Sequence, residues 1–210
     1  MINAIALKKS LLYLVTPARP KAGELAGLLP RVLEAGVDVV QLREKTMEAG
    51  PLLRYCEVAR KATSEFNAIF IVNDRVDVAV AAGADGVHLG QDDLSVSQAR
   101  ALMGSEALIG LSTHSKEHVL AGNVSGADYI AVGPVYETPT KPGRPAVGLE
   151  LPAYAAQNCQ IPWFAIGGID PTTLPWVLEA GAKRVAVLRA VTQADSPAAV
   201  VREIKALLLG

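Results

Sequence analysis

Charged side chains directly follow several apolar segments of this sequence, and their types suit phosphate and metal chemistry. Arg43 and Lys45 follow one apolar segment, and the third cation, Lys141, follows a distant one. Such groups can bind a diphosphate through charge-assisted hydrogen bonds. Asp74 and Asp93 follow two other apolar segments, and two carboxylates with phosphate oxygens are a typical arrangement for holding Mg²⁺. These five side chains therefore predict a diphosphate site with a magnesium ion, provided that the fold brings them together.

Neutral donors accompany the charged groups. The hydroxyls of Ser112, Thr138 and Thr140 can donate to phosphate oxygens. Residues 167–168 are a Gly-Gly pair, whose backbone N–H groups can approach a second phosphate closely. We therefore expect a second phosphate site near the first.

Each of these residues, taken alone, also has a purely structural interpretation. Asp74 and Asp93 could cap helices, and Arg43 and Glu44 could form a solvated ion pair. For His88 we expect a partly buried, hydrogen-bonded histidine rather than a metal ligand. The functional interpretation depends on all of these groups sharing one surface of the fold.

A helix–glycine–strand junction recurs four times and defines the elements that must position these residues. Each glycine stands where a helix would end in the left-handed conformation. The four glycines are Gly36, Gly83, Gly126 and Gly181. Apolar segments rich in Val and Ile follow these glycines or lie between them, and we expect strands at 12–15, 39–43, 69–72, 87–89, 108–111, 129–133, 163–166 and 185–188.

Eight buried strands joined by helices predict an α/β protein with a parallel sheet. The spacing leaves about 25 residues per strand–helix unit, which is enough for a crossover connection. An open doubly wound sheet stays an alternative, but eight regular units favour a single (β/α)8 TIM barrel over residues 1–210. In such a barrel the active site lies at the C-terminal rim of the strands, where the polar residues follow each strand.

Composition narrows the function classes. The 210 residues are 50% hydrophobic, and 20 Lys and Arg against 21 Asp and Glu give a net charge of −1. No overall basic field is therefore available for a nucleic acid or an anionic membrane, and an anionic ligand must be bound locally. Two cysteines are too few for a disulfide framework, and we expect no leader or membrane span and a cytoplasmic location.

The chain resembles the thiamine phosphate synthase family over roughly residues 11–191. Each matching segment is short, but the segments occur in the order that the family has. They are Gln41-Leu42-Arg43-Glu44-Lys45, Asn73-Asp74-Arg75-Val76-Asp77, Gly86-Val87-His88-Leu89-Gly90-Gln91-Asp92-Asp93-Leu94, Ser112-Thr113-His114-Ser115, Gly133-Pro134-Val135, Thr138-Pro139-Thr140-Lys141 and Ala165-Ile166-Gly167-Gly168-Ile169.

This resemblance implies a Mg²⁺-dependent transferase that joins two small molecules. The substrates would be 4-amino-2-methyl-5-(diphosphooxymethyl)pyrimidine and 4-methyl-5-(2-phosphooxyethyl)thiazole, and the products thiamine phosphate and diphosphate. In the family's dissociative chemistry diphosphate leaves first, and the thiazole nitrogen then attacks the methylene cation. Such a reaction needs leaving-group stabilisation and positioning more than a protein nucleophile. We expect no nucleic acid or membrane partner, and a homodimer is left open.

The resemblance also assigns residues to each ligand. Those implied for the pyrimidine diphosphate are Gln41, Leu42, Arg43, Glu44, Lys45, Asn73, Ser112 and Lys141, with Arg43, Lys45, Ser112 and Lys141 in catalytic roles. Those implied for the thiazole phosphate are Thr138, Pro139, Thr140, Gly168, Leu188 and Arg189. Asp74 and Asp93 match the family's Mg²⁺ ligands. Arg189 departs from the family, since many relatives have serine there, and we expect it on the phosphate side.

Two other functions stay open. A related thiazole tautomerase has the same barrel and transfers a proton, for which His114 could serve. A noncatalytic sensor of thiamine phosphates would also bind these ligands. The retained cations and carboxylates favour the synthase, because neither alternative expels a diphosphate.

Overall fold

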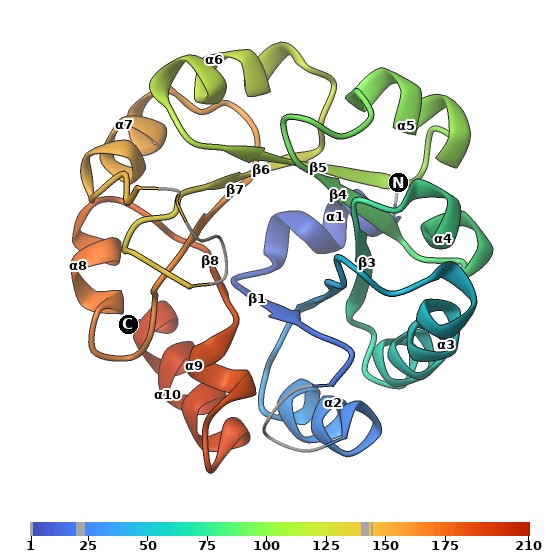
Figure 1. Cartoon of the computed structure of the whole chain (residues 1–210). Helices are drawn as coiled ribbons and strands as arrows, with labels where there is room; N and C mark the ends of the chain where they lie inside the picture. The colour runs from blue at the N-terminus through green and yellow to red at the C-terminus, as the bar shows by residue number, and fades with distance from the viewer. Residues whose placement is uncertain (1, 20–23, 140–142, 144) are drawn as a thin grey trace.

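The computed structural model describes residues 2–19, 24–139, 143 and 145–210. Eight parallel strands form a closed barrel in chain order (Figure 1). The strands are β1 (Leu12–Thr16), β2 (Val39–Leu42), β3 (Ile69–Asn73), β4 (Gly86–Leu89), β5 (Leu108–Thr113), β6 (Tyr129–Val132), β7 (Trp163–Ile166) and β8 (Val185–Val187). Pairing of β1 with β8, with Leu12 opposite Val185, closes the sheet. The predicted (β/α)8 barrel is confirmed, and the open sheet is excluded.

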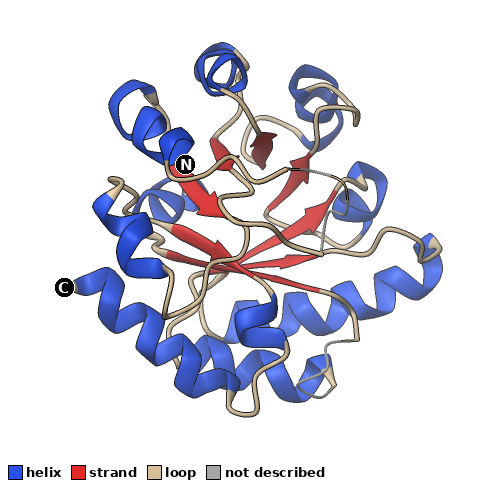
Figure 2. Cartoon of the chain, turned by 60° about the vertical axis from the view of Figure 1, so that its left-hand side comes forward, coloured by secondary structure: helices blue, strands red, loops and turns tan. Residues whose placement is uncertain are grey.

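Helices surround the barrel (Figure 2). They are α1 (Ile2–Lys9), α2 (Leu25–Glu34), α3 (Ala49–Glu65), α4 (Val76–Ala81), α5 (Val96–Met103), α6 (Lys116–Val124), α7 (Glu150–Asn158), α8 (Leu174–Glu179), α9 (Arg189–Thr192) and α10 (Pro197–Leu209). All four junction glycines have positive φ, between 58° and 117°, as the repeat predicts. Among the described residues no helix is long and apolar enough to cross a membrane.

Alternation along the strands divides the buried side chains into two layers. Side chains such as Val40, Phe70 and Val87 point outward and pack in one large cluster with the helices. A smaller cluster fills the barrel interior, and Leu7 of α1 joins it. Its buried members are Leu7, Tyr13, Val15, Val39, Ile69, Ile71, Leu108, Tyr129, Phe164 and Ala186. The interior is therefore packed with side chains and is not an open pore.

Aspartates at the junctions tie the N-terminal ends of the strands to the helices. The carboxylates of Asp38, Asp85 and Asp128 accept backbone N–H groups at the start of the neighbouring strand, at 2.8–2.9 Å. The donors are Leu11 and Leu12 for Asp38, Phe70 for Asp85 and Ile109 for Asp128. Each carboxylate also forms an ion pair with a helical cation, at distances of 2.6–2.9 Å. The three cations are Arg60, Arg100 and Lys205. The aspartate that stands two residues after the glycine in three of the four junctions therefore has a structural role.

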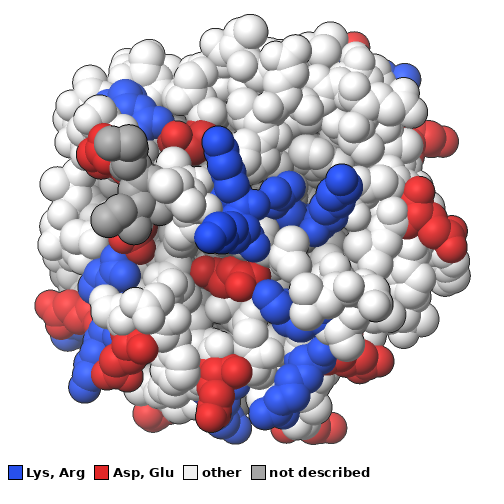
Figure 3. Space-filling model, turned by 180° about the vertical axis from the view of Figure 1, so that it is seen from behind, with Lys and Arg blue, Asp and Glu red and all other residues white. Residues whose placement is uncertain are grey.

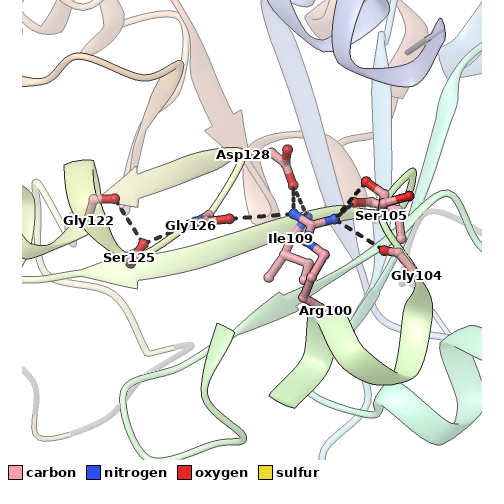
Figure 4. Close-up of polar contacts among 10 residues, drawn as sticks. Arg100, Gly104, Ser105, Ile109, Gly122, Ser125, Gly126 and Asp128 are labelled. Carbon is pink, nitrogen blue, oxygen red and sulfur yellow. Dashed lines mark hydrogen bonds and ion pairs between the residues drawn. The ribbon is translucent and has the colours of Figure 1, made fainter. Parts of the chain in front are cut away.

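Figure 4 shows the tie made by Asp128. Its Oδ2 accepts the backbone N–H of Ile109 at 2.8 Å and lies 2.6 Å from Arg100 Nη2. Arg100 also donates to the backbone carbonyls of Gly104, directly after α5, and of Gly126, between α6 and β6. One ion pair thus connects α5 to the starts of β5 and β6.

The fourth junction carries Lys183 and Arg184 where the others carry aspartate. Arg184 instead donates to the carbonyl oxygen of Lys8 at 2.8 Å, which connects β8 to the end of α1.

Basic and acidic side chains are neighbours near the middle of the face turned away from the viewer in Figure 1 (Figure 3). On this face, therefore, side chains of opposite charge lie next to each other, in keeping with the net charge of −1.

We predict that Asp128→Ala lowers the free energy of unfolding by about 2–3 kcal/mol, because it leaves the Ile109 N–H and the Arg100 guanidinium without their carboxylate. Urea unfolding measures the change. The matched control is Asp77→Ala, which removes a more exposed ion pair with Arg75 and should cost less than about 1 kcal/mol. Equal losses in the two variants would contradict the structural role of Asp128.

Candidate active site

A cavity of about 310 Å³ opens among the C-terminal ends of the strands. Every strand contributes one or more wall residues, and the one from β3 is its last residue, Asn73. The lining residues are Tyr13, Val15, Gln41, Arg43, Asn73, His88, Ser112, His114, Ala131, Gly133, Pro134, Thr138, Phe164, Ile166, Gly167, Gly168, Ile169, Asp170, Ala186, Val187, Leu188, Arg189 and Ala190. The cavity therefore lies at the rim where the sequence predicts the active site.

Four polar side chains line one wall of this cavity and are nearly inaccessible to solvent. Gln41, Asn73, His88 and Ser112 are 3–6% exposed and come from four consecutive strands, β2 to β5. Register places Asn73 opposite His88, and Ser112 opposite Ala131. Because these positions face inward, the residues meet inside the closed barrel although they are far apart in the chain.

A continuous hydrogen-bonded chain connects three of these residues with two tyrosines. Gln41 Nε2 donates to the Tyr13 hydroxyl at 2.8 Å, and the hydroxyls of Tyr13 and Tyr129 are 2.9 Å apart. The Tyr129 hydroxyl lies 3.2 Å from His88 Nδ1, and His88 Nε2 lies 3.0 Å from Ser112 Oγ. This chain of five residues crosses the barrel interior.

The chain depends on a glycine in β5. A Cβ on Gly110 would lie 2.2 Å from Cζ of Tyr129 and 2.5 Å from Nδ1 of His88, so no other residue fits beside the two rings. Burial raises the pKa of both Tyr13 and Tyr129, although the hydrogen bonds of Tyr13 oppose the shift. Both phenols therefore keep their protons at neutral pH.

Asn73 differs from its neighbours because its Nδ2 atom is buried and has no hydrogen-bond partner. A buried donor without an acceptor costs free energy, and such a group in a native cavity calls for a ligand or water. Asn73 lines the cavity. Its amide is therefore suited to donate to an acceptor atom of a bound molecule.

Asp74, Asp93 and Lys45 form a charged edge next to the cavity lining: Asp74 follows the lining residue Asn73 in the chain, and Lys45 and Asp93 both contact Asp74. Asp74 follows β3 with a φ of 59°, a left-handed conformation that is uncommon for a residue with a side chain, and it forms an ion pair with Lys45. Asp93 Oδ2 accepts the backbone N–H of Gly90 at 2.7 Å. Burial raises the pKa of Asp74, Lys45 lowers it, and the nearby Asp93 carboxylate raises it further.

This donor set fits a divalent cation that also has ligands from a substrate. Two neighbouring carboxylates repel each other unless a proton or a cation lies between them. In the part of the chain that the structure describes, no group of three His, Cys, Asp or Glu could hold a metal by itself. Asp74 and Asp93 would therefore supply two oxygen ligands, and phosphate oxygens or waters the others.

Two of the three predicted cations lie within the described residues. Arg43 lines the cavity, whereas Lys45 is not among the lining residues and pairs with Asp74, its side chain 51% exposed. Lys141 and Thr140 lie outside the described residues. Glu44 Oε1 accepts the backbone N–H of Ala18 at 2.7 Å, while the Leu42 side chain packs in the outer core. Neither Glu44 nor Leu42 lines the cavity.

Residues predicted for the second phosphate line the opposite part of the same cavity. They are Thr138, Gly168, Leu188 and Arg189, whereas Pro139 is exposed and does not line it. Gly168 has a φ of 66°, and a Cβ there would lie 2.6 Å from Cβ of Tyr136. The glycine pair therefore lets the segment after β7 pack closely against the segment after β6.

Sequence reasoning missed several wall residues, among them Tyr13, Phe164 and Asp170. Asp170 Oδ1 accepts the backbone N–H groups of Thr172 and Thr173 at 2.9 Å, which caps the following turn. His88 makes two side-chain hydrogen bonds, as expected for a buried histidine. A tyrosine in an otherwise aliphatic strand, as in 12–15, is the one signal that could have indicated the aromatic wall residues.

Comparisons with known proteins agree with this geometry. A family model described as "Thiamine monophosphate synthase" matches residues 12–191. Thiamine-phosphate synthase of Acidothermus cellulolyticus is 51% identical over 205 residues, covering 97% of each chain. That of Mycobacterium tuberculosis is 46% identical over 213 residues and covers 96% of each. The Nostoc punctiforme enzyme is 50% identical over 91% of this chain, which spans 54% of that relative's length.

Solved structures of other proteins superpose on this fold. Thiamine phosphate pyrophosphorylase from Pyrococcus furiosus superposes with a TM-score of 0.88 at 32% identity, covering 97% of both chains. 3-Hexulose-6-phosphate synthase superposes with a TM-score of 0.66 at 21% identity, over 94% of this chain and 99% of its own. The second similarity is one of fold alone.

We predict that Asp93→Asn lowers the pKa of Asp74. Burial and the Asp93 carboxylate both raise that pKa, and the substitution removes the second cause while Lys45 continues to lower it. NMR titration of the labelled Asp74 carboxyl carbon measures the change. Asp92→Asn, which alters the exposed neighbouring residue, is the control and should leave the pKa unchanged. A pKa of Asp74 that stays the same or rises in Asp93→Asn would show that the two carboxylates do not interact.

Proposed function

The chain belongs to the thiamine monophosphate synthase family, and we propose that it joins an aminopyrimidine diphosphate to a thiazole phosphate. The products are thiamine phosphate and diphosphate. As a member of this family the chain is a transferase of thiamine biosynthesis. The observation that carries the substrate assignment is the cavity at the rim. Its buried polar wall includes the unpartnered amide of Asn73, and the next residue, Asp74, contacts both Lys45 and Asp93.

The polar wall suits the pyrimidine ring. Asn73 Nδ2 can donate to a ring nitrogen or another acceptor, and the orientation of the Gln41 amide is fixed by its bond to Tyr13. Aromatic and aliphatic groups such as Tyr13, Phe164 and Ile166 line the same cavity and provide apolar contact area. A flat heterocycle with polar edges matches this combination.

The charged edge suits the diphosphate. Arg43 and Lys45 can donate to its oxygens, and the sequence predicts the same role for Lys141. Asp74 and Asp93 would hold Mg²⁺, which neutralises charge on the diphosphate when it is bound. When the carbon–oxygen bond breaks, its electron pair leaves with the diphosphate, and the donors at this edge stabilise the added charge. The electrons of the aminopyrimidine stabilise the methylene carbon, which the thiazole nitrogen then attacks.

The opposite part of the cavity suits the thiazole phosphate. The Arg189 side chain and the segments around Thr138 and Gly168 line it, and backbone N–H groups near a left-handed glycine can approach a phosphate closely. Both ligands then lie in one enclosed space. This arrangement brings the two reacting atoms together and limits the access of water to the cation.

The tautomerase and the sensor gain no support from the family model or from the relatives. His114 lines the cavity, but its Nδ1 faces the carbonyl oxygen of Gly133. The direct test is incubation with both substrates and Mg²⁺, followed by detection of thiamine phosphate. Its formation supports the synthase, whereas conversion of the thiazole phosphate alone, without the pyrimidine, would indicate a tautomerase.

We expect Asp93→Ala to reduce turnover by about 100-fold or more, because it removes one proposed Mg²⁺ ligand at the leaving group. The rate of thiamine phosphate formation at saturating Mg²⁺ is the measurement. Asp92→Ala, which changes the exposed neighbour, should retain the parent rate. An Asp93→Ala enzyme as active as the parent would overturn the metal assignment.

Asn73→Leu should leave the melting temperature nearly unchanged while it weakens the pyrimidine site. The substitution removes a buried donor that has no partner within the protein, so the loss of that donor itself does not break an internal bond. We expect kcat/KM for the pyrimidine substrate to fall by about tenfold or more, as for a lost hydrogen bond to a ligand. Parent-like kcat/KM would show that Asn73 does not contact the substrate.

A further inference from the structure

We propose that the buried hydroxyl of Tyr129 is a positioning group that acts through His88 and fixes Ser112 as a hydrogen-bond donor toward the cavity. The order of donors and acceptors along the buried chain from Gln41 to Ser112 supports this role. Tyr129 has no other part in the proposed reaction.

The chain has one order of donors and acceptors in which each phenol proton has an acceptor. Gln41 Nε2 can only donate, so the Tyr13 oxygen accepts and its proton is directed to Tyr129. The Tyr129 oxygen accepts this proton, and its own proton is then directed to His88 Nδ1. This is the arrangement in which both phenol protons have an acceptor within the chain.

The same order selects one tautomer of His88. Since Nδ1 accepts from Tyr129, the proton of the neutral ring is on Nε2, which donates to Ser112 Oγ at 3.0 Å. The charged imidazolium does not fit, because its Nδ1–H would face a hydroxyl whose proton then has no acceptor. Ser112 Oγ accepts from the ring, and its hydroxyl proton can therefore be directed into the cavity, which Ser112 lines.

Tyr129 can act only through other residues. Its side chain is 0% exposed and does not line the cavity, whereas Tyr13, Gln41, His88 and Ser112 all do. Gly110 provides the space that the Tyr129 and His88 rings occupy together. The hydroxyl of Tyr129 is thus placed beneath the wall, where a ligand in the cavity does not reach it.

The consequence for catalysis rests on the proposed function. A Ser112 hydroxyl that donates into the cavity stabilises negative charge on a departing diphosphate oxygen. A Ser112 that donated to His88 instead would present only lone pairs to that oxygen. The tautomer of His88 itself does not depend on the substrate, so it can be tested separately.

The first test is ¹⁵N NMR of the imidazole rings in the ligand-free protein. The chain has three histidines, and His114 is an internal reference for a protonated Nδ1, because its Nδ1 faces a carbonyl oxygen that can only accept. We expect a protonated Nε2 and an unprotonated Nδ1 for His88. In Tyr129→Phe the two nitrogen shifts of His88 should move toward each other as both tautomers become populated.

Tyr13→Phe is the matched control, since it removes a hydroxyl from the same chain but leaves Tyr129 with His88 as its acceptor. The His88 tautomer should be retained in this variant. A His88 that carries its proton on Nδ1 in the parent, or that keeps the parent shifts in Tyr129→Phe, overturns the proposal.

The second test separates positioning from packing. Tyr129→Phe should lower kcat by about tenfold, as for one weakened hydrogen bond to a charged group, with KM for both substrates unchanged. Tyr154→Phe on the outer helix α7 should leave both parameters at the parent values. A parent-like kcat together with the expected NMR change would refute only the catalytic consequence. An absence of synthase activity in the parent would instead refute the proposed function.

Discussion

Closure of the parallel sheet is the constraint on which this site depends. Pairing of β1 with β8 leaves the inward-facing side chains of all eight strands a single enclosed space. A polar residue at such a position loses water, and it must find a partner within the barrel or a ligand in the cavity. Gln41, His88 and Ser112 have such partners in one hydrogen-bonded chain, and Asn73 Nδ2 is left without one. The preference for a ligand is therefore already present in the ligand-free protein.

The fold and the rim could be predicted because their signals are local. A glycine that ends a helix and a polar residue that follows a strand are both visible within a few positions of the sequence. The tyrosine chain could not be predicted, because it depends on the register of strands that are up to 116 residues apart. Tyr129 looks like an ordinary core aromatic in the sequence, and the ties of Asp128 to Ile109 and Arg100 likewise depend on contacts between distant segments.

The residues that the family motifs assign to ligands fall into two groups, those that line the cavity and those that do not. Arg43, Asn73, Ser112, Thr138, Gly168 and Arg189 line the cavity as the family motifs suggest. Glu44 binds a backbone group of the first loop and Leu42 packs outward, since consecutive residues of a strand and its loop cannot all face one cavity. A net charge of −1 conceals this arrangement, because the cations and carboxylates at the rim are few and cancel in the sum.

We propose above all that the buried wall and the charged edge form one site for a heterocyclic diphosphate with a divalent cation. A crystal structure with Mn²⁺ and inorganic diphosphate tests this proposal most directly, because Mn²⁺ prefers oxygen ligands as Mg²⁺ does and is visible by anomalous scattering. We expect an anomalous peak at Asp74 and Asp93, with the diphosphate bound beside Arg43 and Lys45. Diphosphate bound in the cavity with the metal elsewhere, or with no metal at these carboxylates, would contradict it.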